Sequence, residues 1–187
     1  MIELIYPYDI APIVPAPTAD SVAMKARASE WLPIVEPNGL VVGRSVRQYC
    51  HSSAKPLHPV IHIHIIDRFS RVYLQKRALH KDIQPGKWDT AVGGHVSYGE
   101  SLIEAVYREA SEELGFSEFN PIYLETYEFE SSMEREMVNV FAAVGSFELH
   151  PDLDEVAEGR WWDIEDIDAN IGTGVFTPNF ESEFQMI

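Results

Sequence analysis

The sequence predicts a layered α/β fold with a mixed β-sheet. Segments with the two-residue alternation of β-strands surround one long helical segment, and no internal repeat or low-complexity tract interrupts them. The chain has 187 residues, 45% of them apolar, which fits one domain with additions at its ends. Residues 1–30 are proline-rich and lack periodicity, so we expect an N-terminal extension followed by a domain over residues 31–187.

The expected elements follow in order. WLPIV and LVVG flank a Pro-Asn-Gly turn and predict a hairpin, and VIHIHII and RVYLQKR predict a second one around residues 67–70. PGKWDTAVGG is rich in turn residues. SLIEAVYREASEEL has helical periodicity, and Gly115 is expected to end that helix. PIYLETYEFE and MVNVFAAVGSF predict two more strands, and WWDIEDIDANI and PNFESEFQMI predict short helices.

Composition narrows the classes of function. The net charge of -16 argues against nucleic acid and anionic membranes, because both bind clustered lysine and arginine. No apolar run approaches the roughly 20 residues of a membrane span, and no signal peptide is expected. The single cysteine, Cys50, cannot form an intramolecular disulfide, so we expect a reducing, cytoplasmic compartment. A homodimer is one expected state, on base rates.

The long helix carries three carboxylates on one face. A helix turns about 100° per residue, so Glu109, Glu112 and Glu113 fall within one arc of about 100°. Their repulsion destabilises the helix unless a cation neutralises it, and Mg²⁺ or Mn²⁺ suits oxygen ligands. The alternative is a solvated acidic face with ion pairs between neighbouring turns. On the helix alone, both interpretations stay open.

Residues around the helix support the metal interpretation. Arg108 is four residues before Glu112 and is also within reach of Glu100, so it can hold the acids in place. Gly93 and Gly94 let the backbone approach closely, so that a carbonyl can complete a metal shell.

These residues resemble the Nudix box. Gly94, five residues, Glu100, seven residues and then REASEELGF match every fixed position of that pattern. The resemblance implies an α/β/α sandwich with a mixed β-sheet and hydrolysis of a nucleoside diphosphate linked to another moiety. It also implies that Glu109, Glu112 and Glu113 bind the divalent ions, often with the carbonyl of Gly93. The metal then activates water and offsets phosphate charge.

A second resemblance covers roughly residues 32 to 145. LHPVIHIHII, VYLQKRALHKDIQPGKW, GGHVSYGE and EREMVNVF are similar to isopentenyl diphosphate isomerase, a relative with the Nudix fold. That resemblance implies a second site, suited to a transition-metal ion, at His51, His58, His95, Glu134 and Glu136. It further implies diphosphate binding by Arg77 and Lys81, with Arg47 as a looser counterpart.

The isomerase pattern breaks at two positions. Gly93 stands where that family has its catalytic cysteine, and Asn179 stands where it has a tryptophan after Ser-Pro. Glycine has no group that moves a proton at carbon, so we predict hydrolysis of a diphosphate as the main function. An isomerase-type enzyme is the first alternative. A non-catalytic module that senses a nucleotide-like ligand is the second.

Several residues have two interpretations. Glu134 or Glu136 could serve as the base that activates water. The three histidines either bind metal or form a hydrogen-bonded remnant of such a site. His62 and His64 are expected to be ordinary polar-face residues of a strand. The tryptophans at 161 and 162 are expected to pack in the core or on the sheet, in preference to stacking on a ligand.

Overall fold

The computed structural model describes residues 30–79, 83–152 and 156–187, so nearly all of the expected N-terminal extension lies outside the described residues. The chain divides into two compact units, which are described separately. Unit 1 comprises the described residues up to Ile61, His95–Ala105 and Thr126–Asn139. Unit 2 comprises His62–Gly94, Val106–Glu125 and Val140–Ile187.

Unit 1 begins with the first predicted hairpin, which is confirmed. Strand β1 (Trp31–Val35) pairs antiparallel with β2 (Val41–Val46). The turn between them closes through a 2.8 Å hydrogen bond from the Gly39 N–H to the Glu36 carbonyl. Gly39 adopts a φ of 83°, a conformation that glycine enters at little cost. A single helical turn, α2 (Arg47–Cys50), follows directly and was not predicted.

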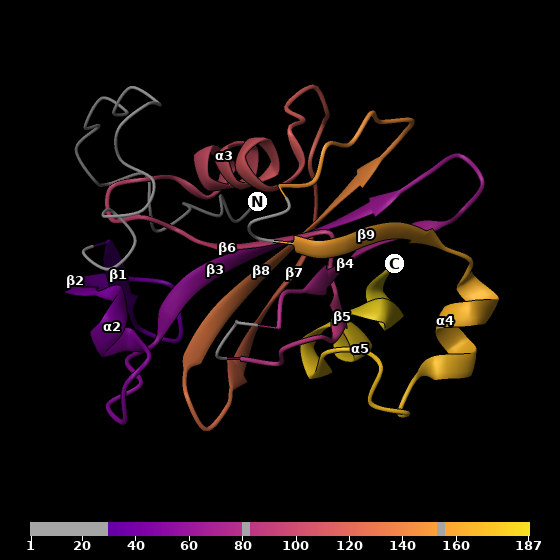
Figure 1. The fold of residues 1–187 in the computed structure, drawn as a ribbon. Helices are drawn as coiled ribbons and strands as arrows, with labels where there is room; N and C mark the ends of the chain where they lie inside the picture. The colour runs from indigo at the N-terminus through magenta and orange to yellow at the C-terminus, as the bar shows by residue number, and fades with distance from the viewer. Residues whose placement is uncertain (1–29, 80–82, 153–155) are drawn as a thin grey trace. The chain divides into compact units, whose positions relative to one another are not determined.

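The main sheet has seven strands in the order β5-β4-β3-β8-β7, with β6 paired to β3 and β9 paired to β4 (Figure 1). Their bounds are β3 His58–Ile66, β4 Val72–Arg77, β5 Trp88–Asp89, β6 Val92–His95, β7 Ile122–Glu130, β8 Arg135–Val144 and β9 Val156–Trp162. Residues of both parities are buried along β3, as in a strand covered on both faces. The fold is therefore α/β, with a mixed sheet and helices.

The second predicted hairpin is also confirmed. Strands β3 and β4 are antiparallel, with Ile65 opposite Tyr73. Their turn is held by Asp67, whose Oδ1 accepts hydrogen bonds from the N–H groups of Phe69 and Arg71, at 2.8 and 2.9 Å. Two nitrogens of the Arg71 guanidinium, Nε and Nη2, both donate to the other oxygen, Oδ2. Burial opposes ionisation of Asp67, but these hydrogen bonds and the Arg71 charge outweigh it and lower its pKa.

Helix α3 (Leu102–Leu114) is the predicted long helix. Ser101 and Glu104 form a reciprocal capping box at its start: the Glu104 N–H donates to Ser101 Oγ, and the Ser101 N–H donates to Glu104 Oε2. Gly115 ends the helix with a φ of 64°. The stripe that packs inward consists of Val106, Ala110 and Leu114, all fully buried.

The structure adds to one predicted segment and corrects another. The turn-rich segment PGKWDTAVGG also contains β5 and the first three residues of β6. Trp161 and Trp162 do not open a helix, because they lie at the end of β9, opposite Tyr73 and Val72 of β4. The predicted helices themselves exist: α4 (Ile164–Asn170), and α5 (Pro178–Glu183), which continues as a short 3₁₀ turn, η2 (Phe184–Met186).

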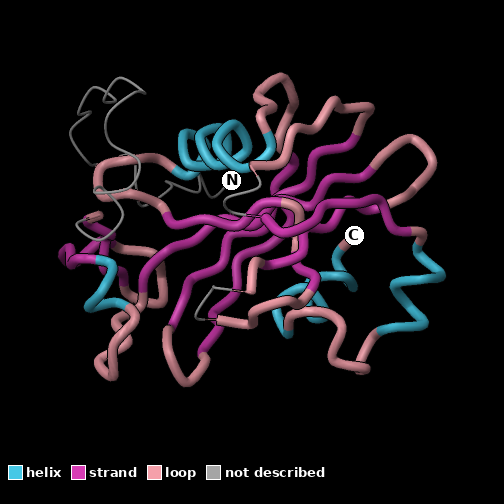
Figure 2. Tube along the Cα trace, viewed as in Figure 1, coloured by secondary structure: helices cyan, strands magenta, loops and turns pink. Residues whose placement is uncertain are grey.

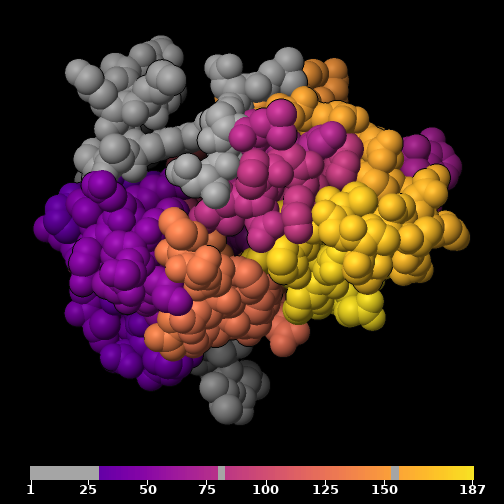
Figure 3. All heavy atoms as spheres, turned by 60° about the horizontal axis from the view of Figure 1, so that its bottom comes forward, coloured from indigo at the N-terminus to yellow at the C-terminus, as the bar shows by residue number. Residues whose placement is uncertain are grey.

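The C-terminal segment supplies the core of unit 2 beside β4 and β5. Figure 2 shows α4 and α5 as separate helical segments joined by a loop, and Figure 3 shows the yellow C-terminal atoms against the magenta chain around β4. The core cluster consists of Val72, Leu74, Trp88, Trp162, Ile167, Phe176, Phe180 and Phe184. Within the described residues, no helix is both long and apolar enough to cross a membrane.

Candidate active site

Helix α3 brings the three predicted acids of unit 2 onto one face. Arg108 Nη1 lies 2.7 Å from Glu109 Oε1 and 3.3 Å from Glu112 Oε2. Glu113 Oε2 accepts a 3.1 Å hydrogen bond from the Gln75 side chain. Glu109 is buried, whereas the Glu112 side chain is 52% exposed. The three acids therefore extend from the interior to the surface. Arg108 pairs with two of them, Glu109 and Glu112.

Two glycines of β6 approach these acids. The Gly93 N–H lies 3.4 Å from Glu113 Oε2, within hydrogen-bond distance. A Cβ added to Gly94 would overlap the carboxyl group of Glu109. Glycine at position 94 therefore leaves room for the Glu109 carboxyl group beside β6. In unit 1, Glu100 Oε2 accepts a 2.9 Å hydrogen bond from the Ser97 N–H, in the turn before α3.

Arg77 and Arg47, two of the three predicted diphosphate-binding cations, have acidic or carbonyl partners. Arg77 Nε donates to the Ile83 carbonyl at 2.9 Å, and its Nη1 lies 3.1 Å from Asp89 Oδ2. In unit 1, Arg47 Nη1 lies 3.4 Å from Glu30 Oε2. Lys81 lies outside the described residues.

Unit 1 gathers the three predicted histidines into one cluster. The ligand atoms of His51, His58 and His95 lie within 4.8 Å of one another, which is compatible with a shared metal ion. His51 Nε2 is 3.0 Å from His95 Nε2, and the rings of His58 and His95 are stacked. Glu134 Oε2 lies 3.7 Å from His51 Nε2, and Glu136 is buried at the start of β8.

His58 provides the observation that tests a metal at this cluster. Its Nδ1 is 2.9 Å from the Pro56 carbonyl and so carries the hydrogen of that bond. Its Nε2 is buried and has no hydrogen-bond partner among the described residues. Burial lowers the pKa of His58, opposed by the bond to Pro56 and helped by the Arg47 charge, which favours the neutral ring. A neutral imidazole with an orphaned, buried lone pair fits a metal ion.

Cys50 does not provide a reactive thiol in place of the missing cysteine. It is buried, and burial raises the pKa of its thiol to about 11. A thiol with such a pKa is protonated near neutral pH, whereas the nucleophilic form is the thiolate.

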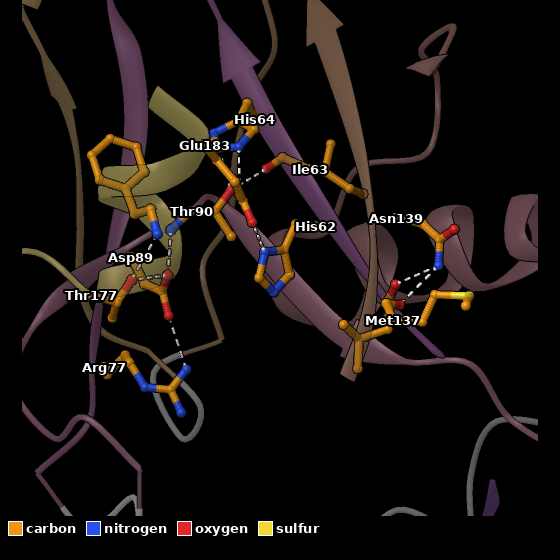
Figure 4. A network of polar contacts seen from close by, with 12 residues as sticks. His62, Ile63, His64, Arg77, Asp89, Thr90, Met137, Asn139, Thr177 and Glu183 are labelled. Atoms are coloured by element: carbon orange, nitrogen blue, oxygen red, sulfur yellow. Dashed lines mark hydrogen bonds and ion pairs between the residues drawn. The ribbon is translucent and has the colours of Figure 1, made fainter. Parts of the chain in front are cut away.

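The sequence interpretation missed a buried polar network in unit 2 (Figure 4). His62 and His64 are not solvent-facing strand residues, because both bind the buried carboxylate of Glu183 on α5. A signal for this was present: Glu183 lies three residues after Phe180 and one before Phe184, which places it on the apolar face of that helix. No comparable pattern in the sequence marks Gln75 as a partner of Glu113.

Comparisons with known proteins fit this geometry. The NUDIX domain family model matches residues 56–180. The chain belongs to the NUDIX family. It is 35% identical over 142 residues to isopentenyl-diphosphate Delta-isomerase of Leifsonia xyli subsp. xyli, covering 72% of this chain and 77% of the relative.

The isomerase, together with a second relative, confirms both predicted resemblances, and a solved structure confirms the predicted fold. An uncharacterised Nudix hydrolase of Yersinia pestis is 34% identical over 161 residues, covering 82% of this chain and 83% of the relative. A crystal structure of the Deinococcus radiodurans protein DR0079 superposes with a TM-score of 0.72 at 22% identity, covering 83% of this chain and 98% of that one. This NUDIX chain is thus similar to isomerases and to hydrolases.

Proposed function

We propose that this NUDIX protein hydrolyses a diphosphate linkage, in a nucleoside diphosphate joined to another moiety or in a related organic diphosphate. The observation that carries the proposal is the acid set of α3, in which Glu109 and Glu112 share Arg108 while Glu113 meets the Gly93 backbone. Carboxylates placed this close favour a bound cation, and Mg²⁺ or Mn²⁺ matches their oxygen ligands.

The chain's own residues would hold this site in shape. Glu109, Glu112 and Glu113, with the Gly93 carbonyl, would be the metal ligands, and Arg108 and Gln75 fix the carboxylates. Bound Mg²⁺ or Mn²⁺ would supply an activated water and offset the phosphate charge. Glu136 is our candidate for the base that removes a proton from water, with Glu134 as the alternative.

We assign diphosphate binding first to Arg77. Its guanidinium is held by Asp89 and by the Ile83 carbonyl, so its donors have a fixed direction, which suits phosphate oxygens. Lys81 and Arg47 remain further candidates. The net charge of -16 leaves a small-molecule diphosphate as the favoured ligand over nucleic acid or a membrane, and we place the protein in the cytoplasm.

The test is a screen of nucleoside diphosphate derivatives and isoprenoid diphosphates with Mg²⁺ and Mn²⁺, read by phosphate release. On the substrate found, Glu112→Gln and Glu113→Gln should each lower turnover at least about 100-fold, since even outer partners of metal ligands are worth about 10- to 100-fold. Glu104→Gln is the matched control, because it neutralises an acid of the same helix and a glutamine can keep the capping box. Unaltered turnover in the Glu112 and Glu113 variants would contradict the proposal.

The second candidate function is that of an isopentenyl diphosphate isomerase. It is favoured by the relatives that carry this name and by the orphaned Nε2 of His58 in the histidine cluster. Against it stand Gly93 and the protonated Cys50 thiol, which leave no thiolate to move a proton. Deuterium uptake into isopentenyl diphosphate in heavy water is the direct test. We expect none, and uptake would favour the isomerase.

We also propose that the histidine cluster binds a transition-metal ion through His51, His58 and His95. Of Glu134 and Glu136, the one that does not act as the base for hydrolysis is a further ligand. Titration with Co²⁺, followed by its visible absorption, should reveal binding that His58→Asn weakens. His150→Asn serves as the control, because that histidine is exposed and pairs with Glu148. Equal Co²⁺ binding in both variants would rule out His58 as a ligand.

A further inference from the structure

A buried carboxylate in unit 2 joins two histidines, and the proposed hydrolysis makes no use of it. Glu183 Oε1 lies 2.6 Å from His62 Nδ1, and Glu183 Oε2 lies 2.8 Å from His64 Nε2 (Figure 4). The side chains of Glu183 and His64 are fully buried, whereas that of His62 is 12% exposed. Of these three residues, His62 is therefore the one that a ligand can reach.

The carboxylate fixes which His62 nitrogen carries a hydrogen toward it. Burial opposes ionisation of Glu183, but the charges and hydrogen bonds of His62 and His64 outweigh it and hold its pKa well below the usual range. An ionised carboxylate only accepts hydrogen bonds, so His62 donates from Nδ1. The other nitrogen, Nε2, is on the far edge of the ring, pointing away from Glu183.

Further hydrogen bonds position His64, and through it the Glu183 carboxylate. Thr90 Oγ1 donates to the Ile63 carbonyl at 3.0 Å and lies 3.3 Å from His64 Nδ1. The next residue back, Asp89, accepts from the Thr90 N–H and pairs with Arg77. The network thus links the proposed diphosphate-binding arginine to the residues that orient His62.

The Nε2 edge of His62 lies beside Gly93. A Cβ added to Gly93 would stand 3.4 Å from His62 Cδ2 and 3.6 Å from His62 Nε2, so glycine places no side chain against this edge. The N–H of the same glycine is within hydrogen-bond distance of Glu113 of the acid set. One glycine therefore separates the oriented imidazole from the proposed metal-binding helix.

We propose that His62 contacts a phosphate oxygen of the diphosphate ligand through Nε2, and that Glu183 is the positioning residue that orients its ring. The assignment rests on the proposed function for the class of ligand and adds α5 to the parts of the chain that form the site. An imidazole that carries a hydrogen on both nitrogens can keep Nδ1–H on the carboxylate while Nε2–H donates a charge-assisted hydrogen bond to an anionic oxygen.

The first test is made on the wild-type chain, with methylene diphosphonate and Mg²⁺. This analogue has a carbon bridge in place of the hydrolysable oxygen, so binding is measured without turnover. Long-range proton–nitrogen correlation spectra of the histidine rings should show the His62 Nε2 resonance move on binding. A His62 resonance that stays in place while the analogue binds overturns the proposal, and so does failure of the analogue to bind.

The second test is a double-mutant cycle on analogue affinity. His62→Gln should raise the dissociation constant about tenfold, the size expected for one hydrogen bond to a charged group. Glu183→Gln should raise it by a similar factor, and the double variant should be no weaker than His62→Gln alone, because Glu183 acts through His62. Effects that add independently, or an unchanged constant in His62→Gln, contradict the assignment.

A control separates positioning from general stability. Asp67→Asn removes another buried, hydrogen-bonded carboxylate of unit 2 whose partners are Phe69 and Arg71. It should lower the melting temperature without changing the dissociation constant. An analogue that shifts His62 in a chain that hydrolyses no diphosphate would disprove the proposed hydrolysis but leave this assignment intact. Hydrolysis of a diphosphate by a chain that does not bind the analogue would support the proposed hydrolysis and overturn this assignment.

Discussion

At the scale of single residues, Gly94 is the position where one methyl group has the largest predicted effect on the acid set. Its Cβ would overlap the Glu109 carboxyl group, so Gly94→Ala should displace that group from its place beside Arg108. We expect a loss of about 1 to 3 kcal/mol in the free energy of unfolding, as for overpacked cores, together with loss of diphosphate turnover. Urea denaturation and the phosphate-release assay measure the two effects.

Gly43→Ala is the matched substitution for this experiment. Gly43 lies on β2, and no atom stands within 4 Å of the position its Cβ would take. The free energy of unfolding should change by less than about 0.5 kcal/mol, and turnover should not change. Similar losses from Gly43→Ala and Gly94→Ala would mean that packing against Glu109 is not the cause.

Residue chemistry also explains what the sequence could and could not predict about the site. Glu109, Glu112 and Glu113 were predictable together because one helix determines their spacing. The histidine cluster was suggested only by resemblance, since His51 and His95 are brought together by the fold. Contacts such as those of Gln75 with Glu113, or of Glu183 with the two histidines, depend on packing between distant segments that no local pattern encodes.

At the scale of elements, α5 depends on Thr177, the residue just before its first turn. Thr177 accepts a 3.2 Å hydrogen bond from the Phe180 N–H as the N-cap, and it donates to Asp89 Oδ1 at 2.7 Å. Thr177→Ala should lower the free energy of unfolding by about 0.5 to 2 kcal/mol, the usual range for a lost cap. Thr177→Ser keeps the hydroxyl and should lose much less. Equal losses of unfolding free energy in the two variants, measured by urea denaturation, would mean that the threonine methyl group and not the hydroxyl stabilises α5.

Element prediction failed where burial overrode local pattern. Trp161 and Trp162 precede an amphipathic segment and were assigned to its helix, but pairing of β9 with β4 places them in a strand and buries Trp162. The hairpins and α3 were predictable because turn residues, capping residues and periodicity agree within a few residues of sequence. β5 has two residues and β6 has four, too few for periodicity to be recognised.

At the scale of the whole molecule, buried carboxylates predict loss of stability in acid. Glu183 and Asp67 have folded-state pKa values below their ordinary values of 4.5 and 3.8. The unfolded chain therefore takes up protons first as the pH falls, so the stabilisation is complete above about pH 5 and declines below it. Glu183→Gln should flatten this decline, as measured by urea denaturation across the acid range. An identical pH profile in the variant would contradict the assignment.

The aromatic core of unit 2 has an optical consequence. The rings of Trp88 and Trp162 lie 5.2 Å apart, nearly perpendicular at 77°, and the Arg160 guanidinium lies 4.0 Å above the Trp162 ring. Two indole chromophores in such a fixed arrangement couple their electronic transitions and give a circular dichroism signal in the near ultraviolet. Phe176, just before α5, packs against Trp162. The circular dichroism signal would therefore show whether the C-terminal segment is packed against the core, without any added label.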